Sequence, residues 1–140
     1  YDSPEALALA GGLTAILSGI AYKTSAEMAR ELGPFPAYQR NSRDMLRVIR
    51  NHRRAAYDAD SSEYEALTVV PQGLDATICP PAILAAARRA WDEALELGET
   101  HGFRNAQVSV IAPTGMATTH STRNGTMART PKRYSMQRSP

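Results

Sequence analysis

The chain has 140 residues, of which 43% are hydrophobic and 21% charged, a composition typical of a globular protein. Its length sets an upper limit of one domain, and a single cysteine excludes a disulfide-rich secreted fold. Aromatic residues make up 6% of the chain, which is low for a self-sufficient core, and the first residue is Tyr1. We therefore expect a segment of a larger protein.

The net charge of +2 is unevenly distributed along the chain. Residues 39–54 hold six arginines and one acid, and residues 116–140 hold five bases and no acid. Residues 55–115 are acidic, with nine acids and three bases. The mean charge therefore says little about partners, whereas the two basic blocks are candidate contacts for polyanions.

The first predicted helix begins at Ser3 and Pro4, which are favoured at helix N-termini. One face carries large aliphatic side chains at helical spacing, and the opposite face carries small residues instead of charges. The large residues are Leu9, Leu13, Ile16, Leu17 and Ile20, and the small ones are Ala8, Gly11, Gly12, Ala15 and Gly19. We expect this helix to be buried on both sides. Its uncharged stretch of 17 residues is shorter than the roughly 20 that span a bilayer, so no membrane contact is expected.

Two further helices are predicted before residue 58. Thr24 and Glu27 have the spacing of a capping box, which indicates that a second, short helix starts there and ends at Gly33. Asn41 or Ser42 can cap a third helix that runs to about residue 57.

The C-terminal half combines an irregular segment, a helix and a strand. Residues 58–78 contain chain breakers, and a helix then runs from Pro81 to about Leu97, ending at Gly98 or Gly102. Residues 105–112 are rich in β-branched side chains and predict a strand. The remainder, residues 116–140, has no apolar period and is expected to be disordered. The predicted fold class is mainly α with one or a few strands.

The turn after this strand is the feature most closely tied to chemistry. Pro113, Thr114, Gly115 and Met116 follow the strand directly, and the amides of such a loop can bind phosphate. On spacing alone, an ordinary turn explains the same residues. Cys79 has no neighbouring base in sequence and is expected to be an inert thiol.

Other polar residues favour structural roles. The arginines of the third helix, Arg43, Arg47, Arg50 and Arg54, form a ridge along one face. This ridge is either solvated, or paired with the acids Asp58, Asp60, Glu63 and Glu65, or in contact with nucleic acid phosphates. The absence of interleaved aromatic residues disfavours nucleic acid. Asp92, Glu93 and Glu96 are expected on a solvated helix face, and the three histidines lack metal-ligand spacing.

Residues 101–115, which read His-Gly-Phe-Arg-Asn-Ala-Gln and continue through the predicted strand to Pro-Thr-Gly, carry a family resemblance. They resemble the stretch of ribonucleotide reductase large chains that leads to the substrate phosphate loop, in the adenosylcobalamin-dependent (class II) branch. Further matching segments are residues 1–22, 26–29, 31–36, 45–57 and 85–95.

This resemblance implies a partial reductase barrel domain over residues 1–115, taken from an α/β barrel of ten strands. The parent enzyme would reduce ribonucleotides to deoxyribonucleotides with a cysteine thiyl radical, which adenosylcobalamin generates. Pro113, Thr114, Gly115 and Met116 would bind the substrate phosphate. The radical cysteine would lie outside this segment, and Cys79 does not match its motif.

The same resemblance sets expectations for partners and location. The partners are a ribonucleotide and the rest of the reductase chain, the location is cytoplasmic, and adenosylcobalamin is not expected on this segment alone. Beyond Gly115 the basic tail, residues 116–140, departs from the family pattern, so the isolated chain is expected to be inactive. The alternative function is a small helical module that binds nucleic acid through the arginine ridge and the tail.

Overall fold

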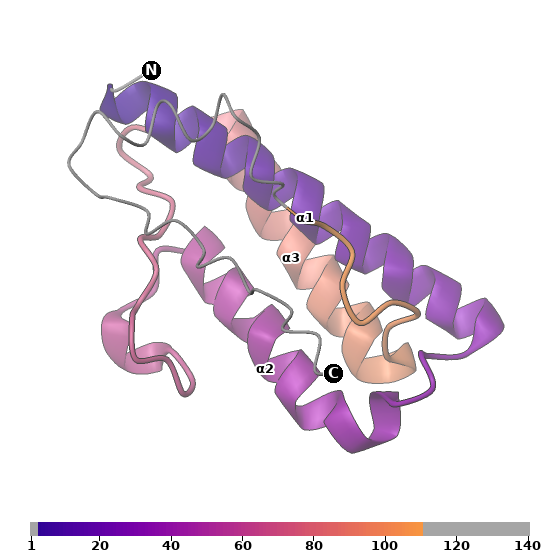
Figure 1. The fold of residues 1–140 in the computed structure, drawn as a ribbon. Helices are drawn as coiled ribbons and strands as arrows, with labels where there is room; N and C mark the ends of the chain where they lie inside the picture. The colour runs from indigo at the N-terminus through magenta and orange to yellow at the C-terminus, as the bar shows by residue number, and fades with distance from the viewer. Residues whose placement is uncertain (1–2, 111–140) are drawn as a thin grey trace, which may run out of the picture. The chain divides into compact units, whose positions relative to one another are not determined.

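Three α-helices and one 3-10 turn form the part of the chain that the structure, a computed structural model, describes, namely residues 3–110. They are α1 (Pro4–Leu32), α2 (Tyr38–Ala56), η1 (Ser61–Glu63) and α3 (Pro81–His101). Helices α1 and α3 lie side by side and run in the same direction, and α2 runs antiparallel to both and packs mainly on α3 (Figure 1).

Helix α1 is continuous through the capping-box sequence, so the predicted break at Thr24 is wrong. Its N-terminus is capped as expected, because the Ser3 hydroxyl accepts a hydrogen bond from the Ala6 amide. Around Thr24, packing outweighs the local signal, since the neighbouring Ser25 and Ala26 are buried. The helix ends as predicted at Gly33, whose amide donates to the carbonyl of Ala29.

The other two helices are longer than expected. Helix α2 begins at Tyr38 because its buried ring packs edge-on against Phe35 and anchors the first turn. Asn41 donates to the Ala37 carbonyl inside the helix and does not cap it. Helix α3 passes through Gly98 and ends at Gly102, which has a φ of 73°.

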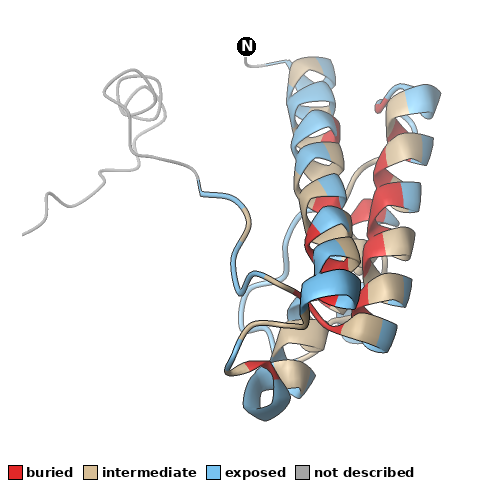
Figure 2. Cartoon of the chain, turned by 90° about the vertical axis from the view of Figure 1, so that its right-hand side faces the viewer, coloured by how far each residue is buried: buried red, intermediate tan, exposed pale blue. Residues whose placement is uncertain are grey.

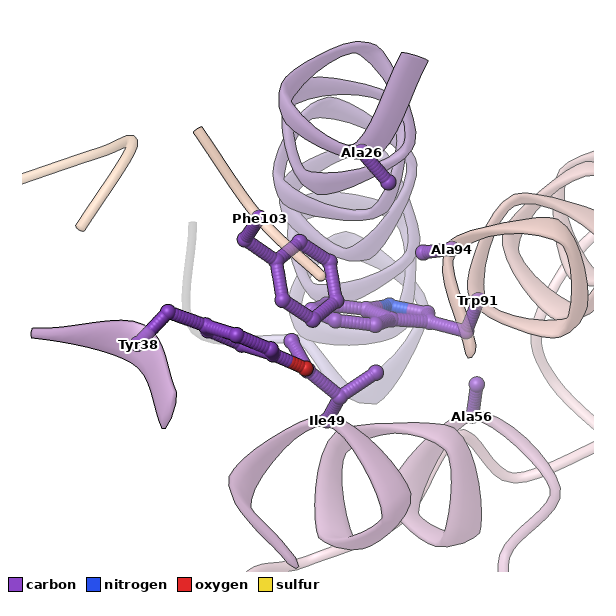
Figure 3. Packing of buried hydrophobic residues seen from close by; sticks show 7 residues of the cluster. All are labelled: Ala26, Tyr38, Ile49, Ala56, Trp91, Ala94 and Phe103. Atoms are coloured by element: carbon purple, nitrogen blue, oxygen red, sulfur yellow. The ribbon is translucent and has the colours of Figure 1, made fainter. Parts of the chain in front are cut away.

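A cluster of aromatic and aliphatic side chains joins the three helices to the segment after α3. Its buried members are Ala26, Tyr38, Ile49, Ala56, Trp91, Ala94 and Phe103, which converge from every side in Figure 3. Tyr22 borders the cluster, with its ring centroid 5.9 Å from that of Trp91 and 5.8 Å from that of Phe103. The aromatic rings of Trp91, Phe103, Tyr38 and Tyr22 therefore fill a volume in the core that the small alanine side chains could not fill.

The face of α1 that packs on α3 is the small one. Gly12, Gly19, Ser25, Ala26 and Ala29 are buried, whereas most of the large aliphatic side chains on the other face are exposed. Small residues allow the two helix backbones to approach closely, which large side chains would prevent. We predicted that α1 is buried on both sides. Within residues 3–110, only its side toward α3 is buried.

Helix α1 also has the length and apolar composition of a possible membrane span, alone among the helices of residues 3–110. Core helices of soluble proteins can satisfy the same criterion, and the Gly and Ala face of α1 is occupied by α3. The criterion alone therefore does not assign α1 to a membrane.

The strand predicted over residues 105–112 is not formed across residues 105–110, and residues 111 and 112 lie outside the described range. A strand requires a neighbouring strand for its backbone hydrogen bonds. Within residues 3–110 every long element is helical, so no such neighbour is present.

Replacing either of two glycines of α1, Gly11 and Gly19, by alanine should change the stability of the protein in opposite directions. A Cβ at Gly19 would lie 2.9 Å from the Cβ and 3.2 Å from the carbonyl carbon of Ala90, whereas at Gly11 it would make an ordinary 3.4 Å contact with Leu74. Gly11→Ala should raise the free energy of unfolding by about 0.5–1 kcal/mol through helix propensity. Gly19→Ala should lower it by about 1–3 kcal/mol through overpacking. Urea denaturation followed by circular dichroism measures both, and equal signs would contradict the close α1–α3 contact.

Candidate functional site

The candidate phosphate loop, Pro113, Thr114, Gly115 and Met116, lies outside the described residues. The structure instead describes the segment that leads to it. This segment starts at Gly102, where α3 ends, and continues to Val110. Its first four residues, 102–105, belong to the sequence motif on which the family resemblance depends.

Backbone hydrogen bonds fix this motif between α1 and the loop that follows α1. The Arg104 amide donates to the Ser25 carbonyl at 2.9 Å, and the Asn105 amide donates to the Ser25 hydroxyl at 2.9 Å. The Phe103 carbonyl accepts from the Phe35 amide at 2.9 Å. We call this set of contacts the 102–105 clasp.

Side chains complete the clasp. The Ser25 hydroxyl lies 3.2 Å from Oδ1 of Asn105, and the Arg104 guanidinium donates to the carbonyls of Leu32 and Gly33 at the end of α1. The last carbonyls of a helix lack partners within it and carry partial negative charge, which favours a cation at this place. Arg104 therefore caps the C-terminal end of α1, and this role is structural.

Phe103 locks the clasp into the core. Its side chain is fully buried, and its ring occupies the space that a side chain at Gly98 would need, since a Cβ there would approach the ring to 2.1 Å. Tyr38 packs against the same ring and donates its hydroxyl to the Gly98 carbonyl at 3.2 Å. The sequence flagged His101 and Gly102 as a helix end, but gave no signal for the partner Ser25, because its buried position depends on packing.

Two arginines of the ridge form a second tether, which holds the acidic segment after α2 against that helix. Arg50 donates to both carboxylate oxygens of Glu65 at 2.7 and 2.9 Å, and Arg54 donates to one of them at 2.7 Å. Asn51 exchanges two hydrogen bonds with the backbone of Glu65. Of the alternatives for the ridge, pairing with the acidic segment is confirmed for these two arginines, through Glu65.

The rest of the ridge is different. Arg47 lies 3.2 Å from Asp44 on its own helix, and Arg43 is exposed. Residues 58–78 are held on α2 in part by the bidentate pair of Arg50 and Glu65, which is the stronger geometry for arginine and carboxylate.

The acids of α3 do not form a purely solvated face, contrary to expectation. Asp92 accepts hydrogen bonds from Arg53 and from the Tyr57 hydroxyl, both at 2.6 Å, and Glu93 lies 2.7 Å from the ammonium of Lys23. These pairs join α3 to α2 and to α1. Glu96 is exposed as predicted.

Two residues with reactive side chains are placed in structural surroundings. Cys79 is buried, next to Gly12 of α1. His52 stacks on Trp91 with ring centroids 4.7 Å apart, and the loss of water on that face lowers its pKa. Within residues 3–110, no three His, Cys, Asp or Glu side chains are grouped so as to hold a metal ion.

The Gly102 conformation gives a prediction with a matched control. Gly33 and Gly102 both have φ values, 78° and 73°, in a region essentially restricted to glycine. A Cβ at Gly33 would meet open space, whereas at Gly102 it would lie 2.6 Å from the Tyr38 ring. Gly33→Ala should cost about 1–3 kcal/mol of unfolding free energy, and Gly102→Ala should cost about 1 kcal/mol more through the added overlap. Equal losses in urea denaturation would show that the ring yields freely.

The Glu65 tether predicts a dependence of stability on pH. Hydrogen bonds from Arg50, and then from Arg54, lower the pKa of Glu65 to about 2. The lowered pKa means that the tether stabilises the fold fully above the usual carboxyl pKa near 4.5 and is lost as the pH falls toward 2. Glu65→Gln should reduce stability at neutral pH and flatten its fall between pH 5 and about 2.

Thermal unfolding of the Glu65→Gln and Glu96→Gln variants over this pH range measures the effect. Glu96 is exposed, so its variant should follow the parent at every pH. Parallel curves for all three proteins would contradict the tether.

Comparison with known proteins places these features in a family. Residues 1–137 match the family described as "Ribonucleotide reductase, barrel domain". Proteins named vitamin B12-dependent ribonucleotide reductase are 63% identical over 116 residues in Bradyrhizobium diazoefficiens, 60% over 116 residues in Agrobacterium fabrum, and 44% over 115 residues in Streptomyces coelicolor. Each alignment covers 82% of this chain but only 9–10% of the relative. The chain therefore belongs to the ribonucleotide reductase barrel-domain family.

Proposed function

We propose that the chain is a segment of an adenosylcobalamin-dependent ribonucleotide reductase, whose parent enzyme reduces ribonucleotides to deoxyribonucleotides by thiyl-radical chemistry. The observation that carries this proposal is the 63% identity over 116 residues to a vitamin B12-dependent reductase. It supports the class II branch of the family as well as the barrel domain.

The role of the segment in that enzyme is to hold the substrate phosphate loop. Pro113, Thr114, Gly115 and Met116 follow the 102–105 clasp after a short stretch of chain, and Asn105 is fixed on Ser25 of α1. The amides of Thr114, Gly115 and Met116 and the Thr114 hydroxyl are the available donors. Gly115 leaves room for a phosphate oxygen to approach the backbone.

The described residues do not enclose adenosylcobalamin. Two hollows along residues 3–110, one between α1 and α3 and one between α1 and residues 72–78, each have a volume of about 340 Å³ and are open to solvent. A corrin ring with its axial groups is far larger than either. The cofactor and the radical cysteine are therefore assigned to other parts of the parent enzyme, and the segment acts on substrate binding alone.

The nucleic-acid alternative is disfavoured by the pairing of the arginines. Glu65 neutralises charge on Arg50 and Arg54, Asp92 does so for Arg53 and Asp44 for Arg47, so four of the six arginines in residues 39–54 already have acidic partners. The surroundings we propose are those of the parent reductase: a ribonucleotide substrate, the rest of the reductase chain and a cytoplasmic location without membrane contact.

A segment replacement tests the proposed function. Residues 1–115 of this chain are inserted in place of the matching segment of the Bradyrhizobium reductase, and ribonucleotide reduction is assayed with and without adenosylcobalamin. We expect cofactor-dependent reduction within about tenfold of the parent, since the relatives differ at only about a third of the aligned positions. A chimera that folds, binds the cofactor and yet fails to reduce ribonucleotides would refute the proposal.

The phosphate loop is tested in the same chimera. Thr114→Val removes one donor to a charged partner, which typically costs ~1.5–3 kcal/mol, so the Michaelis constant for the ribonucleotide should rise about tenfold or more. Gly115→Val should raise it further by steric exclusion. Cobalt–carbon cleavage of the cofactor, followed by its absorbance, should be unchanged. The control is Thr100→Val, whose hydroxyl bonds only within α3. Unaltered nucleotide affinity in both loop variants would refute the assignment of Pro113–Met116.

A further inference from the structure

A hollow separate from the clasp lies between α1 and α2, with Trp91 of α3 at its floor. Its volume is about 210 Å³, the space of about seven water molecules. Its polar lining residues are Thr14 and Ser18 of α1, His52 of α2, Gln72 and Trp91. The lining contains no Asp, Glu, Lys or Arg. We call it the Trp91 hollow.

The floor of the hollow holds a hydrogen-bond donor without a partner. Trp91 is only 2% exposed, and buried residues such as this one lie along the sides on which the helices face one another (Figure 2). Its indole nitrogen, blue in Figure 3, donates to no other residue of the described range. No side-chain nitrogen or oxygen in that range is both shut off from solvent and unpartnered. The indole N–H is therefore reachable from the hollow that Trp91 lines.

The orientation of the indole ring agrees with this position of its N–H. A Cβ at Gly19 of α1 would lie 3.4 Å from Cδ1 of Trp91, which is the carbon bonded to the indole nitrogen. The N–H edge of the ring thus faces α1, the helix that supplies Thr14 and Ser18 to the wall of the hollow. One face of the ring is covered by His52, whose ring centroid lies 4.7 Å away.

The wall of the hollow adds unused donors and acceptors. The Thr14 hydroxyl donates to the Ala10 carbonyl inside α1 and keeps its acceptor capacity. Ser18, His52 and Gln72 form no side-chain hydrogen bond with another residue of the range 3–110. Burial lowers the pKa of His52, so its imidazole is neutral at neutral pH and offers one donor and one acceptor.

These groups select the chemistry of an occupant. The indole N–H requires an acceptor, which an apolar molecule does not supply, and a donor left unpaired in a buried place is unfavourable. A carboxylate or phosphate would supply acceptors, but its charge would enter a hollow without a lining cation. An amide meets both conditions, because its carbonyl accepts, its N–H donates, and the group is neutral and planar.

We propose that the Trp91 hollow is a binding site for a small neutral amide. The carbonyl oxygen of the ligand accepts a hydrogen bond from the indole N–H of Trp91, and its N–H group donates to the wall, where Ser18 is the α1 acceptor. The site is independent of the proposed phosphate loop, since none of its lining residues belongs to residues 102–116.

A titration followed by nuclear magnetic resonance tests the proposal on the full chain of 140 residues. Trp91 is the single tryptophan, so its indole N–H gives one assigned signal. The ligands are benzamide, benzoate and toluene, which share one ring and differ in the group attached to it. We expect benzamide to shift the signal saturably, with a dissociation constant below about 10 mM. No saturable shift with benzamide, or equally tight binding of benzoate or toluene, would overturn the proposal.

A matched pair of serine variants tests the position of the ligand. Ser18→Ala removes a hydroxyl from the wall and should weaken benzamide binding about two- to tenfold, the range for a neutral hydrogen bond. Ser42→Ala is the control, because its hydroxyl bonds to the Gln39 carbonyl inside α2 and does not line the hollow. Alanine favours helix at both places, and circular dichroism verifies that each variant is folded. Equal affinities of the two variants would overturn the placement.

The chimera with the Bradyrhizobium reductase tests whether the hollow stays open in a complete enzyme. Saturation transfer from protein to benzamide is compared between the chimera and its Trp91→Phe variant, which lacks the indole N–H. We expect transfer in the chimera and a marked loss in the variant. A chimera that fails to bind benzamide, although the chain binds it, would show that another part of the reductase fills the hollow, which overturns the proposal. Because this measurement does not use ribonucleotide reduction, either result leaves the proposed function standing.

Discussion

The close approach of α1 to α3 is the contact on which the rest of the described structure depends. Gly12 and Gly19 have no space for a side chain toward Ile83 and Ala90, and Ala26 is fully buried beside them. This approach places Ser25 within hydrogen-bonding distance of Asn105 and gives Trp91 and Phe103 a shared core. Larger side chains along α1 would separate the helices and move the clasp with them.

Local chemistry was sufficient to predict where helices occur and where several of them end. Ser3 with Pro4, Gly33, and Gly102 act through backbone conformation and capping, which depend on a few neighbouring residues. The predicted break at Thr24 failed because burial of Ser25 and Ala26 outweighs one capping signal. The strand failed for a related reason: residues 3–110 contain no second strand, and a strand preference cannot be realised without a neighbour for its backbone hydrogen bonds.

The candidate site was predictable to a different degree. The phosphate loop came from resemblance and lies outside the described residues, so it stays a prediction. The partner of the arginine ridge was one of several open alternatives, and only the fold selects Glu65 from the acids of residues 58–65. Periodicity in α1 likewise identifies two uncharged faces but not which of them meets α3. Both decisions depend on contacts between segments far apart in the chain.

The clasp also explains why a motif shared with an enzyme family need not contain catalytic groups. In residues 102–105, the backbone turn requires Gly102, the core requires the Phe103 ring, and Arg104 and Asn105 bind the end and the middle of α1. Each residue is thus committed to holding the chain against α1 and the core. Because the contacts of the clasp are made to α1 and to the loop that follows it, a small shift of α1 would displace the clasp with it.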